Sequence, residues 1–431
     1  MTRPDGNVEK DCAPFGLVGH PLGHSWSPKI HGMLGSVPYD LHDLEPDQVE
    51  DFVRNGSWRG LNFTIPYKAL AATLSDSRSD RVRELGVANT LVRRPDGSIF
   101  ADNTDVLGFS RMLEHFCRRE LGTGAEDALA GRPVCVLGNG GASAAVQAAL
   151  RKAGASLSVI SRSSNDDYEH FLERHADVEL LVNTTPVGMF PACPASVLSL
   201  DVMGRLARLR GVLDVVYNPT RTGICLNAEK LGIPAESGLT MLVSQALCSS
   251  ELFQDVTLDD GDVERIRRSI LDATENVVFI GMPGSGKTTT GKRLARMLGR
   301  PFVDVDDAIE QEEGRAPAQI IGEDGEGAFR RVETRVTGEY GARSGLVIAC
   351  GGGVVTRPEN YDLLHQNGRI VLVDRPLEQL STAGRPMSQA QGVERLARER
   401  MDAYRSWADV TLRCTGSPAG DAQLARALLG L

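Results

Sequence analysis

The sequence predicts an α/β protein built from more than one domain. Short apolar runs alternate with amphipathic helical patterns, and continuous apolar strands separated by such helices are typical of parallel sheets covered on both faces. The chain has 431 residues, and at about 150 residues per domain this length predicts about three units. The apolar runs lie at 133–138, 156–161, 179–184, 211–217, 276–281, 346–350 and 369–374.

The composition is that of a globular protein whose partners are small molecules. Hydrophobic residues make up 41% and charged residues 24% of the chain. The net charge of −10 offers no basic surface to nucleic acid or to an anionic membrane. The eight cysteines stand singly, which predicts reduced thiols. Neither a signal peptide nor an apolar run of the ~20 residues that span a membrane is found, so we expect a cytoplasmic protein.

Four segments in the N-terminal part concentrate Ser, Thr, Asn, Asp and Lys at predicted strand ends. Such residues also form ordinary turns. Lys68 and Asp105 form a pair with a chemical use, because an ammonium oriented by a carboxylate can protonate the alkoxide that hydride delivery to a ketone leaves. A lysine at a solvated surface is the simpler alternative. The segments are VGHPLGHSWSPKIHG, GLNFTIPYK, GVANTL and ADNTDVLGF.

A glycine-rich turn at 138–143, GNGGAS, follows an apolar strand and precedes a helical pattern. Dinucleotide-binding turns have this form, although Ser143 stands in place of the third glycine. After the next strand come Ser161, Arg162 and Ser163. NAD enzymes carry an acid at this place and NADP enzymes an arginine, so the sequence favours NADP. An arginine that only faces water remains the alternative.

Two segments are candidate domain boundaries. The first, at 119–132, is rich in Gly and Ala and precedes the strand before the glycine turn. The second, LDATEN at 271–276, lies between a helical pattern and the next apolar strand. We expect the main boundary at this second segment.

The stretch GMPGSGKT at 281–288 has the spacing of a phosphate-binding loop between a strand and a helix. In such loops the backbone N–H groups surround phosphate oxygens. The residues expected to bind the nucleotide here are Gly284, Ser285, Gly286, Lys287, Thr288 and Thr289. Lys287 reaches the β- and γ-phosphates, and the Thr288 hydroxyl binds Mg²⁺. The motif predicts ATP-dependent phosphoryl transfer or hydrolysis.

Polar residues after the next strands are candidates for the acceptor site. Asp304 and Asp306 have the period of a strand, which places both on one face of a strand end. One carboxylate can serve Mg²⁺ and the other an acceptor hydroxyl. A buried helical stripe including Phe329 leaves Arg330 on a different face, where burial statistics favour solvated surface. Three glycines at 351–353 would let a ring approach the backbone closely.

From about Val277 to the C-terminus these motifs resemble shikimate kinase. The resemblance implies that Asp304 supports Mg²⁺ and that Asp306 holds the substrate hydroxyls and positions the attacking one. The arginine of F-R-x-x-E, Arg330, would pair with the substrate carboxylate as a bidentate fork. The glycines Gly351, Gly352 and Gly353 and a second arginine, Arg400, would complete the pocket.

The chain departs from this family in the lid. Members carry a longer, arginine-rich segment, whereas this chain has STAGRPMSQAQG with a single arginine, Arg385. We expect Arg385 to contact the nucleotide and to stabilise charge on the transferring phosphoryl group. The alternative is a kinase domain that has become a non-catalytic binding module.

From about Phe15 to Leu271 the chain resembles shikimate dehydrogenase. Seven motifs stand in family order: H-S-x-S-P, N-x-T-x-P-x-K, N-T-L, D-N-T-D-x-x-G, the glycine loop, D-x-x-Y-N-P and G-L-x-M-L-V-x-Q-A. The resemblance implies proton transfer by Lys68 and Asp105. It also implies substrate binding by Ser25, Ser27, Thr64, Asn89, Asp105, Tyr217 and Gln245, with Asn62 and Asn103 in the same cleft. The implied cofactor residues are Gly138, Gly140, Gly141, Ala142, Ser161, Arg162, Ser163, Thr184, Gly238 and Met241.

One departure concerns the cofactor. NADP-type members have a second basic residue a few positions after the arginine, and this chain has Asp166 there. A dehydrogenase that prefers quinate with NAD is therefore an alternative. Three nearby histidines, His20, His24 and His31, lack a carboxylate or Cys partner at ligand spacing and predict no metal site.

Together the resemblances imply a bifunctional shikimate-pathway enzyme using NADP(H), ATP and Mg²⁺. The dehydrogenase would have a substrate-binding domain over 1–110 and 238–272 and a Rossmann NADP-binding domain over 111–237. A P-loop kinase domain with a parallel sheet would follow over 276–431. Its substrates would be 3-dehydroshikimate and shikimate.

Overall fold

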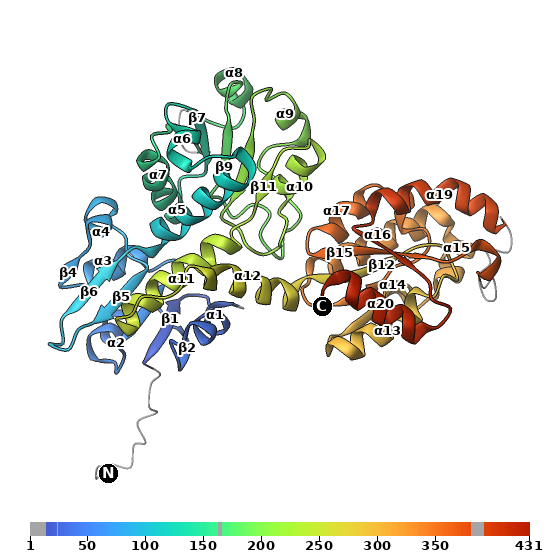
Figure 1. Cartoon of the computed structure of the whole chain (residues 1–431), viewed down its shortest axis with the longest axis horizontal. Coiled ribbons are helices and arrows are strands. Elements are labelled where there is room, and N and C mark those ends of the chain that lie inside the picture. Colours follow the sequence, from blue (N-terminus) through green and yellow to red (C-terminus); the bar gives the residue numbers. More distant parts are fainter. Residues whose placement is uncertain (1–13, 24, 163–165, 381–391) are drawn as a thin grey trace, which may run out of the picture. The chain divides into compact units, whose positions relative to one another are not determined.

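The computed structural model describes residues 14–23, 25–162, 166–380 and 392–431. The predicted α/β class is confirmed, with three sheets in these residues (Figure 1). The chain forms two compact units. The first comprises the described residues of Met1–Pro186, Val197–Tyr217 and Asn227–Ser269, and the second Val187–Ser196, Asn218–Leu226 and Ile270–Leu431.

The first sheet of unit 1 is mixed, in the strand order β2-β1-β3-β5-β6-β4. Its strands are β1 (Phe15–Gly19), β2 (Tyr39–Asp43), β3 (Gly60–Phe63), β4 (Ser77–Arg78), β5 (Thr90–Arg93) and β6 (Ile99–Asp102). The antiparallel pairs β3–β5 and β5–β6 interrupt an otherwise parallel arrangement. The helices between these strands are α1 (Ser27–Leu34), α2 (Val49–Asn55), α3 (Lys68–Thr73) and α4 (Asp80–Leu85).

The second sheet of unit 1 is parallel, in the order β11-β10-β9-β7-β8. Its strands are β7 (Pro133–Leu137), β8 (Ser156–Ile160), β9 (Leu180–Asn183), β10 (Gly211–Asp214) and β11 (Ala235–Glu236). The remaining helices before β12 are α5 (Thr104–Phe116), the π-helical η1 (Cys117–Leu121), α6 (Ala125–Leu129), α7 (Gly141–Lys152), α8 (Phe171–His175), α9 (Leu200–Gly204), α10 (Gly223–Lys230), α11 (Leu239–Gln254) and α12 (Gly261–Thr274). Apolar side chains of α5, α7 and α11 share one core with β7 and β9.

Unit 2 has a parallel sheet in the order β13-β14-β12-β15-β16. Its strands are β12 (Asn276–Ile280), β13 (Phe302–Asp304), β14 (Val347–Ala349), β15 (Gly368–Asp374) and β16 (Val410–Arg413). Its helices are α13 (Lys287–Leu298), α14 (Val305–Glu313), α15 (Pro317–Asp324), α16 (Glu326–Ala342), η2 (Val354–Thr356), α17 (Glu359–His365), η3 (Leu377–Gln379), α19 (Val393–Trp407) and α20 (Pro418–Leu429).

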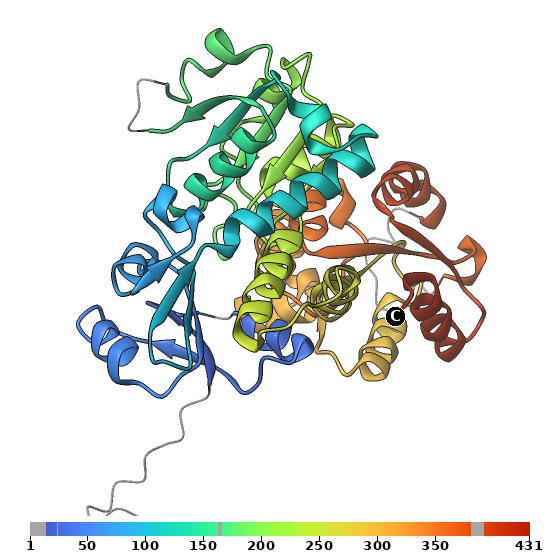
Figure 2. The ribbon, with the colours of Figure 1, turned by 60° about the vertical axis from the view of Figure 1, so that its left-hand side comes forward.

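The central strand β12 shows why this sheet is covered on both faces. Val278 and Ile280 pack with α14, α16 and α19, whereas Val277 and Phe279 pack with α13 and α20. The two helix layers are visible in Figures 1 and 2. All four side chains are buried, as the continuous apolar run predicts.

The two compact units divide between Ser269 and Ile270, one residue before the boundary predicted at 271–276, but the irregular linker predicted there is wrong. Helix α12 continues to Thr274, and β12 begins at Asn276. Ile266 and Ile270 are buried one helical turn apart, and the residues after them include no Gly or Pro to end the helix. The segment 119–132 is likewise largely helical, in η1 and α6, rather than an irregular linker.

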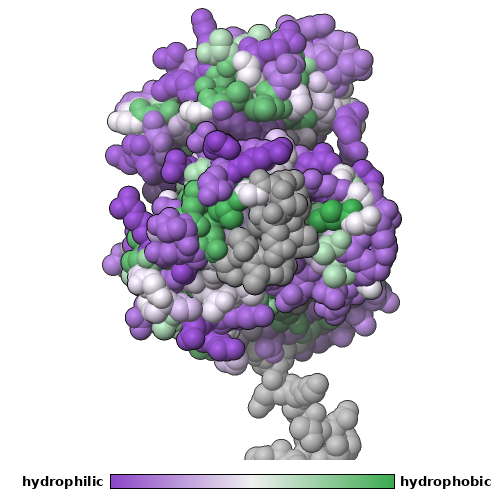
Figure 3. Space-filling model, turned by 90° about the vertical axis from the view of Figure 1, so that its right-hand side faces the viewer, coloured by the Kyte–Doolittle hydropathy of each residue, from purple (hydrophilic) through white to green (hydrophobic). Residues whose placement is uncertain are grey.

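The described residues contain no helix with the length and apolar character needed to cross a bilayer. Figure 3 shows one face of the molecule. Outside the grey atoms it is mostly hydrophilic, with small, separate hydrophobic patches.

Candidate active sites

Unit 1 contains a cleft of about 200 Å³ that we call the dehydrogenase cleft. Residues from the first sheet, from the helices next to it and from the turns around α11 line it. Most of the predicted substrate residues meet there, namely Ser25, Ser27, Asn62, Thr64, Lys68, Asn89, Asp105, Tyr217 and Gln245, together with Ala142, Gly238 and Met241. Segments more than 200 residues apart in the chain therefore share one polar cavity.

The Lys68 ammonium donates to the Asp105 carboxylate at 2.7 Å. Lys68 begins α3, and Asp105 lies in the first turn of α5, where the helix dipole favours a carboxylate. The two side chains are 19% and 10% exposed, so the pair is neither solvated surface nor sealed core. A proton on Lys68 is thus held at the edge of the cleft.

The Asn89 amide holds the Asp105 carboxylate through its other oxygen. Asn89 donates to Oδ1 of Asp105 at 3.0 Å and lies 3.4 Å from the Gln245 side-chain oxygen. Its own oxygen accepts the backbone N–H of Thr104 at 2.7 Å. The N-terminus of α5, the residue before β5 and helix α11 are thereby joined in one hydrogen-bond network at the cleft.

Serines and an aromatic side chain complete the polar lining. Ser25 and Ser27 lie 3.1 Å apart through their hydroxyls, at the start of α1. Such paired hydroxyls can donate to one carboxylate. Burial raises the pKa of Tyr217, which keeps its hydroxyl protonated and able to donate.

Two predicted neighbours have other roles. Asn103 caps α5 by accepting the N–H of Val106, and it donates to the Val87 carbonyl, so it does not line the cleft. His31 stacks on Tyr39 with ring centroids 4.1 Å apart. Burial lowers its pKa to about 3, which leaves the ring neutral. The described residues contain no metal-binding cluster of His, Cys, Asp or Glu.

The glycine turn lies where β7 leads into α7. Gly138 has φ of +101°, and a β-carbon on it would lie 2.7 Å from the Thr185 side chain. Thr184 donates to the carbonyls of Leu137 and Gly138 and holds the turn against β9. Positions 140 and 141 face open space, so the backbone at this helix N-terminus can receive a pyrophosphate.

The end of β8 presents Ser161 and an exposed Arg162 beside the glycine turn. The third predicted residue, Ser163, lies outside the described residues. Asp166 contacts His175 at 2.9 Å and Arg174 at 3.6 Å. The Asp166 carboxylate therefore faces the following helix, α8, where Arg174 supplies an opposite charge.

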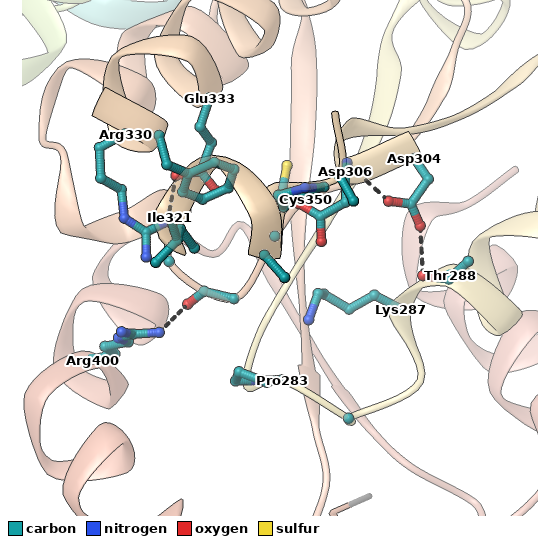
Figure 4. Close-up of a pocket in the computed structure, with 18 of the residues that line it drawn as sticks. Pro283, Lys287, Thr288, Asp304, Asp306, Ile321, Arg330, Glu333, Cys350 and Arg400 are labelled. Atoms are coloured by element: carbon teal, nitrogen blue, oxygen red, sulfur yellow. Dashed lines mark hydrogen bonds and ion pairs between the residues drawn. The ribbon is translucent and has the colours of Figure 1, made fainter. Parts of the chain in front are cut away.

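Unit 2 contains a larger cleft, of about 630 Å³, that we call the kinase cleft. The carboxyl ends of β12, β13 and β14 open into it, which is where parallel α/β sheets bind ligands. Figure 4 shows Arg330 and Arg400 at one end, Lys287, Thr288 and Asp304 at the other, and Asp306 between them. The remaining lining residues that the sequence predicts are Gly284, Gly286, Thr289, Gly351, Gly352 and Gly353.

The phosphate loop leads directly into α13. Gly286 has φ of +104°, a conformation that disfavours side chains. Lys287 is buried and its ammonium lies 2.9 Å from the Gly281 carbonyl. The Thr288 hydroxyl donates to Asp304 at 2.7 Å. A hydroxyl and a carboxylate oxygen side by side fit Mg²⁺, which takes few protein ligands and keeps several waters.

The placement of Asp304 and Asp306 on one strand face is wrong. Strand β13 ends at Asp304, which accepts the N–H of Asp306 in the first turn of α14. Asp306 reaches the cleft from that helix. Burial and the charges of Asp304 and Glu333 raise the pKa of Asp306 to about 6.

The expectation of a solvated Arg330 is also wrong. Arg330 is 6% exposed and donates to Glu333 at 2.6 Å and to Glu326 at 3.0 Å. Glu333 is fully buried, and burial raises its pKa. Arg330 Nε is buried without a hydrogen-bond partner among the described residues, and Arg330 lines the kinase cleft.

The three glycines make room for the chain's own side chains. A β-carbon on Gly351 would lie 2.9 Å from Asp306, and one on Gly353 would collide with the Arg330 guanidinium. The Gly352 carbonyl accepts from Arg400 at 3.0 Å and from the Tyr404 hydroxyl. The glycine run thus lets two arginines converge on the cleft.

Sequence reasoning assigned no role to Glu333, which orients Arg330. It is the final residue of the F-R-x-x-E motif, and its spacing of three from Arg330 places both on one helix face. Arg385 lies outside the described residues.

Comparisons with known proteins match each part separately. The shikimate kinase family model matches residues 283–429, and that of the shikimate dehydrogenase substrate binding domain matches residues 17–91. A shikimate dehydrogenase (NADP(+)) from Methylobacterium radiotolerans is 36% identical over 255 residues, which are 54% of this chain and 87% of that protein.

Two solved structures resemble the N-terminal region. Shikimate 5-dehydrogenase from Thermus thermophilus, in complex with NADP(H) and shikimate, is 28% identical with a TM-score of 0.51, covering 59% of this chain and 98% of that one. Quinate dehydrogenase from Corynebacterium glutamicum, in complex with NAD, is 27% identical with a TM-score of 0.52, covering 60% and 98%. The chain thus belongs to the shikimate dehydrogenase family through its N-terminal region and carries a shikimate kinase family domain at its C-terminus.

Proposed function

We propose that the chain is a bifunctional enzyme that reduces 3-dehydroshikimate to shikimate with NADPH and then phosphorylates shikimate at its 3-hydroxyl with ATP and Mg²⁺. The observation that carries this proposal is the presence of two separate clefts, each holding its own nearly complete set of chemical groups. The product of the first reaction is the substrate of the second.

In the dehydrogenase cleft, NADPH when bound supplies the hydride. Lys68 donates its proton to the oxygen of the ketone as that oxygen gains charge, and Asp105 holds the ammonium in place. The hydroxyls of Ser25 and Ser27 bind the substrate carboxylate. Thr64, Asn89 and Gln245 bind its hydroxyls and thereby select a polyol.

In the kinase cleft, ATP with Mg²⁺ when bound supplies the phosphoryl group. Arg330 and Arg400 orient shikimate through its carboxylate. Asp306 accepts the proton of the attacking hydroxyl, which requires its ionised form. Lys287 and the loop N–H groups stabilise the negative charge of the phosphates, and Thr288 with Asp304 holds the metal.

The contacts of Asp166 support NADP as the cofactor. A free carboxylate after Arg162 would repel the 2′-phosphate, but Asp166 is in contact with the His175 ring and with the Arg174 guanidinium, whose charge is opposite. Arg162 then remains as the exposed cation at the end of β8. The similarity to an NAD-bound quinate dehydrogenase keeps quinate with NAD as a second candidate.

A coupled assay on the purified chain tests the proposal. We would supply 3-dehydroshikimate, NADPH and ATP·Mg²⁺ and follow NADPH oxidation and ADP formation separately and together. Shikimate 3-phosphate should accumulate only when all three are present. Parallel reactions with quinate and NAD⁺ test the second candidate.

Each failure has its own meaning. NADPH oxidation without ADP formation, even with added shikimate, would mean that the kinase domain is a non-catalytic binding module. Faster turnover of quinate with NAD⁺ than of shikimate with NADP⁺ would contradict the proposed substrate and cofactor.

A further inference from the structure

The phosphate loop of unit 2 is held from outside the kinase cleft by an arginine that none of the predicted roles uses. Arg375 directly follows β15 (Gly368–Asp374), the strand next to β12 in the sheet. Its Nε–H donates to the Ser285 carbonyl at 2.9 Å. The Arg375 Nη2 atom lies 3.4 Å from the position that a β-carbon on Gly286 would take.

A buried acid fixes this arginine. Asp421 in the first turn of α20 is fully buried and lies 3.3 Å from Nη2 of Arg375. The same carboxylate accepts the N–H and the hydroxyl of Thr415, at 2.5 Å and 2.8 Å. Arg375 itself is 18% exposed. Arg375 after β15 therefore connects the phosphate loop after β12 to Asp421, which in turn binds Thr415 after β16. These three strands are adjacent in the sheet.

We propose that Arg375 is a positioning residue for the nucleotide, because it sets the orientation of the Ser285–Gly286 peptide through Asp421. This inference rests on the proposed kinase function. A trans peptide is planar, with its C=O and N–H pointing in opposite directions. With the Ser285 carbonyl held by Arg375, the Gly286 N–H points away from the arginine. Gly286 lines the kinase cleft, where its N–H would donate to a phosphate oxygen of a bound nucleotide.

Two physical effects favour this role over a purely structural one. A hydrogen bond to a cation polarises the peptide, which strengthens the N–H as a donor on its far side. A partly buried ion pair also contributes little net stability, since desolvation offsets its attraction. The pair therefore acts mainly on geometry, and phosphate affinity is the quantity that it controls.

The test compares nucleotide affinity in four variants of the full chain. They are Arg375→Met, Asp421→Asn, the double variant, and Arg413→Met, which replaces an exposed arginine on β16 as a matched control. We expect Arg375→Met to weaken ADP binding about tenfold, the effect of losing one charged hydrogen bond. The Arg413→Met variant should bind ADP as the parent does. Calorimetry gives the dissociation constants, and dehydrogenase activity confirms that unit 1 is intact.

A second probe separates positioning from other effects. Inorganic tripolyphosphate carries phosphates without a base, so its affinity should fall by the same factor as that of ADP. Shikimate affinity in the absence of nucleotide should be unchanged. The double variant leaves no unpaired buried charge, and it should retain the loss of ADP affinity even if Arg375→Met alone folds poorly.

Three results would overturn the inference. One is ADP affinity within twofold of the parent in both Arg375→Met and the double variant. Another is weaker ADP binding with unchanged tripolyphosphate affinity, which would place Arg375 at the base or ribose. Failure of the parent chain to bind ADP at all would overturn the proposed kinase function together with the inference.

Discussion

Asp306 carries the clearest conflict between stability and function in the chain. Its carboxyl has a pKa raised to about 6 by burial and by the charges of Asp304 and Glu333, compared with about 3.9 in an unfolded chain. Because the folded-state value is higher, ionisation of Asp306 at neutral pH costs folding free energy. The ionised form is nevertheless the form that accepts a proton from the substrate.

Replacing Asp306 should therefore trade activity for stability. We expect Asp306→Asn to lower kinase kcat about 10²- to 10⁴-fold and to stabilise unit 2 at pH 7 by about 1–3 kcal/mol. The stability gain should shrink as pH falls from 7 to 4, because the carboxyl of the parent becomes protonated in this window. Thermal unfolding of the variant and the parent at several pH values measures this difference in stability. Asp307→Asn, at an exposed neighbour, should show neither effect.

Arg330 gives a second prediction at the residue scale. Arg330→Lys keeps the charge but cannot contact Glu333 and a ligand carboxylate as a planar fork. We expect the KM for shikimate to rise about 10- to 100-fold, from the loss of roughly 1.5–3 kcal/mol of charged hydrogen bonding. Initial kinase rates at saturating ATP and varied shikimate concentration measure this KM. Arg331→Lys changes an exposed neighbour, and an equal loss there would contradict the assignment.

Motifs identified most of the cleft residues, but tertiary context decided how they are held. Periodicity placed Asp306 on a strand because the helix of Val305–Glu313 begins within the motif. Burial statistics placed Arg330 in solvent because they ignore a buried acid three residues later. The contact between Gly353 and Arg330 joins segments that only the folded sheet brings together.

At the scale of elements, the end of β8 decides the choice of cofactor. Arg162 is exposed there, whereas Asp166 is engaged by basic groups of α8. We expect Arg162→Ala to raise the KM for NADPH at least about tenfold, since a charged contact to the 2′-phosphate is lost. The KM for NADH should hardly change. Equal losses with both cofactors would contradict a 2′-phosphate contact. The exposed Arg208→Ala serves as the control.

The positions of the strands could be predicted from the sequence, but the residues at which helices begin and end could not. The apolar runs at 276–281 and 369–374 became buried strands because their composition already demands burial on both faces. The boundary between the compact units falls within a residue of the predicted segment 271–276, but polar composition suggested an irregular linker there, whereas packing of Ile270 carries helix α12 to Thr274. The mixed order of the first sheet depends on long-range pairing that local patterns do not encode.

For the whole molecule, the two clefts belong to different compact units. Each cleft draws its polar groups from the sheets, helices and turns of its own unit. A change in the chemistry of one should therefore leave the other reaction intact. The two activities can then be separated by single substitutions.

Lys68→Ala is the substitution that tests this independence. It removes the proton donor of the dehydrogenase while Asp105 keeps its contact with Asn89, so we expect dehydrogenase kcat to fall about 10²- to 10⁴-fold. Phosphorylation of added shikimate should stay within twofold of the parent. Lys152→Ala, at an exposed lysine of unit 1, controls for loss of charge. Because no group of the kinase cleft is changed, a joint collapse of both activities in a folded Lys68→Ala protein would contradict the model of two independent sites.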